Sequence, residues 1–223
     1  RYDGKTVIKC LKHFDSFVLL SKFMTEKLPI GNKPYTVVEG IYNPTDEIRK
    51  LGKNNDSLKR IFYAGTLAKR YGVMNLVKAF TLLKDNDYRL IICGEGDAKK
   101  EIINEAVKDK RIIFKGQLTR DEVLVLQNES DLLINPRTPE GEFTKYSFPS
   151  KTMEYLASGV PALLYKLPGI PDEYYNYCFT IEKLGVVALA DKINEILQMP
   201  TNKLREVGFE ARKFILENKN PKV

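Results

Sequence analysis

Residues 146–161 of this chain read Tyr146-Ser147-Phe148-Pro149-Ser150-Lys151-Thr152-Met153-Glu154-Tyr155-Leu156-Ala157-Ser158-Gly159-Val160-Pro161. Pro149 and Ser150 are typical of a helix start, and Gly159 followed by Pro161 is typical of a helix end. The pattern therefore predicts a helix over residues 150–158.

The start of this predicted helix has the features of an anion site. Free backbone N–H groups at a helix start attract anions through the positive end of the helix dipole. Ser150 and Glu154 share a face, about one turn of 5.4 Å apart, which suits a phosphate and a pair of sugar hydroxyls. A nucleoside diphosphate is the simplest ligand with both groups. The same residues also suit a plain capped first turn, so spacing alone leaves both interpretations open.

Outward from this helix, predicted strands and helices alternate. The strands are expected over residues 60–63, 88–93, 112–114, 131–134, 162–165 and 178–181. The helices are expected over residues 73–83, 97–107, 119–127, 150–158, 185–199 and 203–218. Such alternation is typical of an α/β fold in which a Rossmann-like parallel sheet carries helices on both faces. Ligands bind such sheets at the carboxyl ends of the strands.

The first part of the chain is predicted to belong to a different unit. It contains an expected strand over residues 15–20, a short capped helix over 21–28 and a strand over 35–38. Residues 41–58 are rich in Asn, Pro and Gly and are typical of a linker. Because the chain begins at Arg1 rather than Met, we expect it to be part of a longer protein.

Composition excludes several classes of protein. With 43% apolar and 29% charged residues, the chain is typical of a soluble globular protein, and it has neither a signal peptide nor a run long enough to span a membrane. Cys10, Cys93 and Cys178 are widely separated, which favours a reducing compartment and no metal site. The net charge of +7 is dispersed along the chain, so we expect no nucleic-acid partner. These features predict a cytoplasmic protein without a cofactor.

Several loops after predicted strands carry candidate ligand-binding residues. Gly65-Thr66, Gly94-Glu95-Gly96 and Lys115-Gly116 each follow a predicted strand. A Gly-x-Gly turn without the third Gly is a weak sign of a dinucleotide site. Arg137 follows the strand over 131–134, where it could bind a diphosphate or pair with Glu140 or Glu142 in its own loop.

The segment 146–161 resembles the donor-site signature of retaining glycosyltransferases of the GT-B fold, the group 1 or family 4 type that includes sucrose and glycogen synthases. The family motif has two glutamates with seven residues between them. Glu154 matches the second glutamate, while Tyr146 occupies the place of the first. Phe148 and the closing Gly159-x-Pro161 also match. Pro149 and Lys151, with Glu154-Tyr155, resemble a capsular or lipopolysaccharide subgroup of bacterial enzymes.

The resemblance implies roles for individual residues. Glu154 would hold the ribose, and the expected catalytic residues are Glu154, Arg137 and Tyr146. Glu142 or the Tyr146 hydroxyl would replace the lost glutamate near the transferred sugar. The donor nucleotide would be held by Gly65, Thr66, Lys69, Arg70, Gly94, Gly96, Lys115, Gly116, Ser150, Lys151, Thr152 and Glu154. The family usually has Arg and Lys at the positions of Thr66 and Tyr71, so Lys69 and Arg70 would supply the positive charge from a shifted register.

The resemblance also implies an organisation and an activity. Residues 1–40 would be the tail of an N-terminal acceptor domain, 41–58 a linker, and 59–223 a Rossmann-like donor-binding domain, the C-terminal half of the GT-B fold. The expected function is hexosyl transfer from a UDP- or GDP-linked sugar to a glycan or lipid-linked glycan of a bacterial surface polysaccharide, with peripheral membrane association through the missing domain. This part alone is expected to be inactive. Alternatives are a non-catalytic nucleotide-sugar-binding subunit and an epimerase, although His13 is the sole His available as a base.

Overall fold

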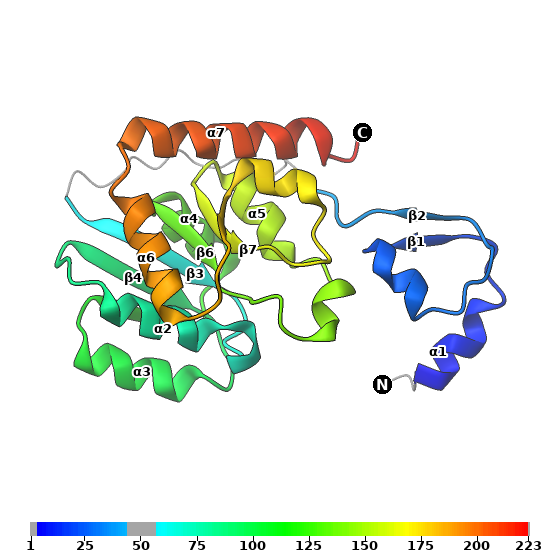
Figure 1. Ribbon diagram of the computed structural model, residues 1–223, viewed down its shortest axis with the longest axis horizontal. Coiled ribbons are helices and arrows are strands. Elements are labelled where there is room, and N and C mark those ends of the chain that lie inside the picture. The colour runs from blue at the N-terminus through cyan, green and yellow to red at the C-terminus, as the bar shows by residue number, and fades with distance from the viewer. Residues whose placement is uncertain (1–3, 44–56, 223) are drawn as a thin grey trace.

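The computed structural model describes residues 4–43 and 57–222, which form a small N-terminal unit and a larger α/β unit (Figure 1). Most of the predicted linker over 41–58 lies outside the described residues. The larger unit contains a six-stranded sheet in which all neighbouring strands are parallel. Its strands are β3 (Lys59–Ala64), β4 (Tyr88–Cys93), β5 (Ile112–Gly116), β6 (Leu132–Asn135), β7 (Ala162–Tyr165) and β8 (Phe179–Ile181).

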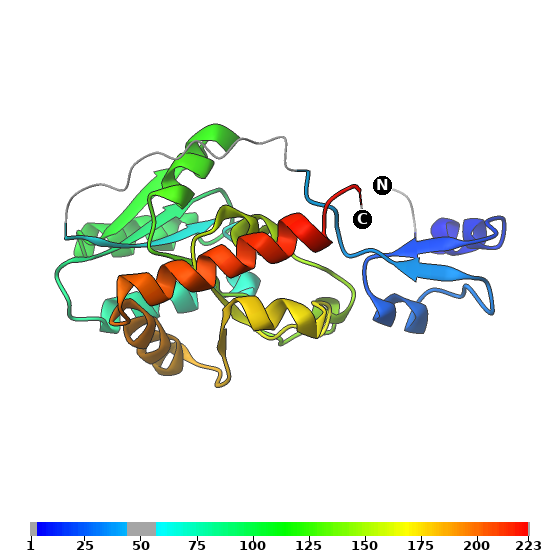
Figure 2. The same ribbon diagram turned by 90° about the horizontal axis from the view of Figure 1, so that it is seen from above.

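Helices cover both faces of this sheet, as the sequence predicts. They are α2 (Val73–Leu82), α3 (Lys99–Lys108), α4 (Arg120–Asn128), α5 (Ser150–Ser158), α6 (Val186–Leu197) and α7 (Thr201–Asn218). Helix α2 packs against α3 and α6, whereas α5 packs against α4 and α7. Figure 2 shows α7, in red, crossing the length of the larger unit toward the N-terminal unit. The predicted Rossmann-like architecture is confirmed.

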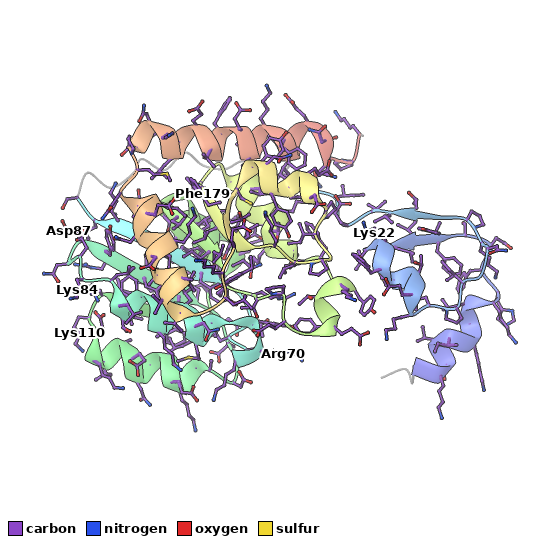
Figure 3. The ribbon with its side chains drawn as sticks, viewed as in Figure 1. Lys22, Arg70, Lys84, Asp87, Lys110 and Phe179 are labelled. Carbon is purple, nitrogen blue, oxygen red and sulfur yellow. The ribbon has the colours of Figure 1, made fainter. Side chains whose placement is uncertain are left out.

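The strand order is β5-β4-β3-β6-β7-β8, so the chain builds outward from β3 in one direction and then returns to continue from β6 in the other. β3 and β6 are hydrogen-bonded neighbours, and the chain continues from them into helices of different groups, α2 with α3 and α6, and α5 with α4 and α7. Such a switch point opens a crevice where ligands of parallel sheets bind. Figure 3 shows the polarity: Arg70, after β3, lies on the side of the N-terminal unit, while Asp87 and Lys110, before β4 and β5, lie at the far end.

The core explains why the strand positions were predictable. The last four residues of β3 and β4, the first three of β6 and all of β7 are buried. The largest fully buried side chains include Tyr155, Tyr174, Phe62 and Phe80. Continuous apolar runs of this kind are typical of strands covered on both faces.

The N-terminal unit comprises α1 (Gly4–Leu11), β1 (Phe17–Leu19), a 3-10 helix η1 (Lys22–Glu26) and β2 (Tyr35–Val37). β1 and β2 pair in parallel, close to the predicted strands. The expected short capped helix over 21–28 is a 3-10 helix, and its cap is the Ser21 hydroxyl, which accepts a hydrogen bond from the N–H of Phe23. Helix α1 was not predicted; it has no buried residue.

Three further 3-10 helices lie in the loops of the larger unit and were also not predicted: η2 (Lys69–Tyr71), η3 (Glu142–Lys145) and η4 (Asp172–Tyr177). Two of them lie near the carboxyl ends of the strands, where ligands of parallel sheets bind. η2 follows β3, and η3 precedes α5. The Ser21 hydroxyl donates a 2.7 Å hydrogen bond to the carbonyl of Lys145, so η3 also contacts the N-terminal unit.

Candidate functional site

The start of helix α5 is open to a ligand. Pro149 is its N-cap residue and supplies no side-chain hydrogen bond, unlike Thr119, which caps α4 in a full capping box. Backbone N–H groups in the first turn of a helix have no intrahelical partner. Ser150, the first residue of α5, is exposed. The helix therefore presents uncapped amides at the carboxyl edge of the sheet, where the partial positive charge of the helix dipole favours an anion.

A cavity of about 190 Å³ lies in front of these amides, at the switch point between β3 and β6. Two cationic side chains line it, Arg137 and Lys151, and no carboxylate appears among the described residues of its wall. The full lining is Tyr63, Ala64, Gly65, Thr66, Tyr71, Asn135, Arg137, Pro149, Ser150, Lys151 and Tyr155. We refer to this as the anion cavity.

A second and larger cavity, of about 530 Å³, shares Ser150 with the anion cavity. Glu154 lines it from α5, and Arg120 lines it from the start of α4. The opposite wall is formed by residues 39–43, where the chain leaves the N-terminal unit. Ser150 and Glu154 thus share a face, as predicted, and the carboxylate faces a cavity adjoining the one that would take an anion.

Lys151 and Glu154 connect the two cavities. The Lys151 ammonium lies 2.7 Å from a carboxylate oxygen of Glu154, one helical turn along α5. Both side chains are partly buried. The ion pair orients the carboxylate, so that its remaining oxygen can accept hydrogen bonds from hydroxyl groups.

Arg137 does not pair with a carboxylate of its own loop, which was one of the two alternatives left open by the sequence. Glu142 is bound by Lys27 at 2.8 Å, and Glu140 accepts a hydrogen bond from the Thr138 hydroxyl at 3.0 Å. The Arg137 guanidinium instead lies over the ring of Tyr71, 4.0 Å from its centroid. Burial lowers the pKa of Arg137, but a guanidinium remains protonated in proteins.

Tyr146 lies outside the walls of both cavities. Its hydroxyl donates a 3.2 Å hydrogen bond to Glu142, and the Lys27 ammonium lies 6.0 Å from its ring centroid. Tyr146 and Glu142 therefore face η1 of the N-terminal unit, and the prediction that one of them acts near the transferred sugar stays a prediction.

Two of the predicted donor contacts do not line either cavity, and their role in donor binding stays a prediction. Thr152 is fully buried, and its N–H donates to the carbonyl of Pro149 at 2.8 Å, so neither its side chain nor its amide faces the cavities. Lys69 turns toward α3, where its ammonium pairs with Glu101 and its N–H donates to Asp97 at 2.9 Å. The shifted register expected for Lys69 does not bring its charge to the anion cavity.

Gly65, Thr66, Ser150 and Lys151 line the anion cavity as predicted donor contacts, whereas the remaining predicted donor contacts are not part of its wall. Arg70 lies beside it, 5.0 Å from the ring centroid of Tyr71. Gly94 and Gly96 lie beneath the loop after β3: a Cβ on Gly94 would meet the carbonyl oxygen of Gly65 at 1.9 Å. Lys115 is exposed, and the carbonyl of Gly116 accepts a 2.8 Å hydrogen bond from Gly94. The close packing at Gly94 and Gly96 positions the loop after β3, which lines the cavity.

Comparison with known proteins gives the chain a family. Residues 44–214 match the family described as Glycosyl transferases group 1. The chain belongs to this family. Comparison with curated protein sequences found no match.

Solved structures share the fold of this glycosyltransferase family member. Sucrose-phosphate synthase from Thermosynechococcus elongatus has a TM-score of 0.75 at 16% identity, over 98% of this chain and 57% of that one. Anabaena HepE, solved with UDP and glucose, has a TM-score of 0.73 at 14% identity, over 97% and 62%. A mutant of S. aureus TarM, solved with UDP among other ligands, has a TM-score of 0.73 at 16% identity, over 98% and 44%. This chain thus spans less than two thirds of the length of each.

Two absences apply to the described part of this family member. No helix in residues 4–43 or 57–222 is long and apolar enough to cross a membrane. No group of His, Cys, Asp and Glu side chains within the same residues could hold a metal ion.

Sequence reasoning missed several residues that line the anion cavity, chiefly Tyr63, Tyr71 and Tyr155. Tyr71 was noted only as a departure from the family pattern. Tyr155 lies on the buried face of α5 beside Met153 and Leu156, and a phenol there was a signal that a polar partner lies in the core. No sequence pattern places Tyr71 next to Arg137, because their contact joins loops after different strands.

Proposed function

We propose that this chain is the donor-binding, C-terminal part of a retaining glycosyltransferase that transfers a hexosyl group from a UDP- or GDP-linked sugar. The observation that carries the proposal is the arrangement around Ser150. The uncapped amides of α5 face a cationic cavity, and Glu154 faces the adjoining larger cavity. A nucleoside diphosphate has a dianionic diphosphate next to a ribose with two hydroxyls, which matches this order.

In the proposed reaction the bond between the sugar carbon and the diphosphate oxygen breaks, and its electron pair leaves with the diphosphate. The acceptor hydroxyl forms the new bond to that carbon and gives its proton to a diphosphate oxygen. The protein's contribution is positioning and stabilisation of the leaving anion, by the amides of α5 and the side chains of Ser150 and Lys151. Glu154 would hold the ribose.

The N-terminal unit supports the proposal that an acceptor domain completes the enzyme. β1 and β2 form a sheet of only two strands, and β2 is exposed throughout. Apolar side chains on this unit are exposed, including Val7, Ile8, Phe14 and Val18. We propose that residues 1–40 are the tail of that domain, that the acceptor is a glycan or lipid-linked glycan of a bacterial surface polysaccharide, and that the missing part takes the enzyme to the inner face of the membrane.

A calorimetric titration of the 223-residue chain with UDP, GDP, ADP and NAD tests the donor site. We expect one nucleoside diphosphate to bind best, and Glu154→Gln to weaken it roughly 10-fold, because a charged hydrogen bond to the ribose is lost. Glu195→Gln is the matched control, since Glu195 also pairs with a lysine three residues away, Lys192 at 2.8 Å, but on α6. Equal binding by both variants would contradict the assigned role of Glu154.

A nucleotide-sugar-binding subunit without catalysis is the second candidate. It is favoured by the family residues that this chain lacks, at the positions of Thr66, Tyr71 and Tyr146. Such a subunit would bind the nucleotide. The whole protein, given the sugar donor and a glycan acceptor, would release no nucleoside diphosphate. An epimerase is less well supported, because His13, its candidate base, is exposed on the N-terminal unit.

A further inference from the structure

Arg137 is a half-buried cation that has no opposite charge beside it among the described residues. Within the residues that the structure describes, no carboxylate lies at ion-pair distance from it, and the acidic side chains of its own loop bind other groups. Its backbone N–H donates to Asn135 Oδ1 at 3.4 Å, which fixes the turn after β6. A partly desolvated charge without a partner costs free energy, so such a group usually has a ligand or an ion as its counter-charge.

Aromatic rings hold the guanidinium in place. Two cations lie against the Tyr71 ring: the guanidinium carbons of Arg137 and Arg70 are 4.0 Å and 5.0 Å from its centroid. Phe143 of η3 lies 5.8 Å from Arg137, and its ring centroid is 6.2 Å from that of Tyr71. Cation–π contacts of this kind are worth about 0.5–2 kcal/mol and fix the plane of the guanidinium. The aromatic rings carry no net negative charge, so the positive charge of Arg137 stays available to a ligand.

The charge of the anion cavity therefore rests on Arg137. Lys151, the other cation in its wall, is already paired with Glu154 at 2.7 Å. Arg70 is not part of the wall, and Lys69 pairs with Glu101. Among the described residues of the cavity wall, the Arg137 guanidinium is the one charge left uncompensated, and it shares the cavity with the uncapped amides of Ser150 and Lys151.

We propose that Arg137 binds the diphosphate of the donor, with Tyr71 as the positioning residue that presents its guanidinium to the anion cavity. This inference rests on the proposed donor-binding function. A planar guanidinium can bind two phosphate oxygens at once, which an ammonium cannot. Because the diphosphate gains negative charge as it leaves the sugar, Arg137 would stabilise the leaving group as well as the bound donor.

Binding of inorganic pyrophosphate, UDP, GDP and the free nucleosides to the 223-residue chain tests the inference. We expect Arg137→Gln to weaken the binding of pyrophosphate, and of whichever of UDP and GDP binds better, roughly 10- to 100-fold, because one charged hydrogen-bonding group is lost. Binding of the free nucleosides should be unchanged. Arg137→Lys should recover only part of the loss. The matched control is Arg111→Gln: Arg111 also lies over an aromatic ring, Phe80 at 5.1 Å, but pairs with Asp109 before β5, at the far end of the sheet. Arg111→Gln should lower the stability of the fold without changing the affinity for pyrophosphate.

Tyr71→Leu tests the positioning role. When Arg137 is present, we expect Tyr71→Leu to weaken pyrophosphate binding roughly 3- to 10-fold, because one cation–π contact is lost. In an Arg137→Gln background the same substitution should cause no further loss of pyrophosphate binding, because the effects of two coupled substitutions on the binding free energy do not add. Additive losses would overturn the role of Tyr71.

The outcomes separate the inference from the proposed function. Diphosphate binding that is unchanged by Arg137→Gln overturns the inference and leaves the donor site intact. Pyrophosphate binding that depends on Arg137, without preference for any nucleoside diphosphate, supports the inference and contradicts the nucleotide function. If the unaltered chain binds none of these probes at millimolar concentration, both are overturned. Urea unfolding of each variant identifies a loss of binding that follows from misfolding.

Discussion

The hydroxyl of Tyr155 accepts a hydrogen bond from the backbone N–H of Ala64 at 3.0 Å and ties helix α5 to the carboxyl end of β3. Tyr155 is fully buried, and burial raises its pKa, so it stays a neutral phenol. This bond fixes the uncapped start of α5 relative to the glycine loop after β3. The two walls of the anion cavity are thereby held at a set distance without any ligand.

Tyr155→Phe should lower the free energy of unfolding by about 1–3 kcal/mol, because it leaves a buried N–H without an acceptor. Urea denaturation measures the change. Tyr165→Phe is the control: Tyr165 is a buried tyrosine of β7 whose hydroxyl has no protein partner in the described residues, and its removal should cost less than about 0.5 kcal/mol. Similar losses in both variants would contradict a specific role for the Tyr155 hydroxyl.

Gly94→Ala should destabilise the loop after β3. Gly94 has a φ of +135°, and an added Cβ would lie 1.9 Å from the carbonyl oxygen of Gly65, a backbone atom that cannot move without the loop. We expect a loss of roughly 3 kcal/mol or more in unfolding free energy, and weaker nucleotide binding.

Gly116→Ala separates strain from collision. Gly116 has a φ of +70°, but nothing lies within 4 Å of an added Cβ there. The left-handed conformation alone should cost about 1–2 kcal/mol. A loss at Gly116 equal to that at Gly94 would mean that collision with Gly65 is not the cause.

Lys219→Met should destabilise the contact between the end of α7 and the chain that leaves the N-terminal unit. Lys219 lies 2.6 Å from Glu39, whose side chain is 8% exposed, and 2.7 Å from Glu173. Removing the cation leaves Glu39 as a buried carboxylate without its charged partner, which costs roughly 3 kcal/mol. Thermal or urea unfolding measures the loss. Lys213→Met, at an exposed lysine of the same helix, should change stability by less than about 0.5 kcal/mol.

The same contact predicts a dependence of stability on pH. Burial alone would raise the pKa of Glu39, but hydrogen bonds from Lys219 and Tyr174 outweigh it and lower the pKa below its ordinary value. A carboxyl with a lowered pKa in the folded state stabilises above its unfolded pKa, about 4.3, and loses this contribution as the pH falls through the folded value. The difference in unfolding free energy between the unaltered chain and Glu39→Gln should be constant from pH 7 to about 5 and shrink below about 4. A difference independent of pH down to pH 3 would exclude Glu39 as the titrating group.

Regular elements were predictable where burial follows a simple period. The helix over 150–158 and the strands over 88–93 and 162–165 have the predicted bounds, because Gly159 ends the helix in a left-handed conformation and the strands are almost wholly apolar. The 3-10 helices were not predictable, since turns such as η3 depend on contacts from elsewhere in the chain. The Lys145 carbonyl at the end of η3, for example, accepts its hydrogen bond from Ser21.

Local periodicity and capping were enough to predict the α/β class, the anion-attracting start of α5 and the face shared by Ser150 and Glu154. The charges that meet at this site follow from the tertiary structure. It turned Lys69 to Glu101, buried Thr152 and placed Arg137 over Tyr71. These contacts join loops after different strands, and their geometry depends on how the parallel sheet brings the carboxyl ends of β3 and β6 together, which no local pattern encodes.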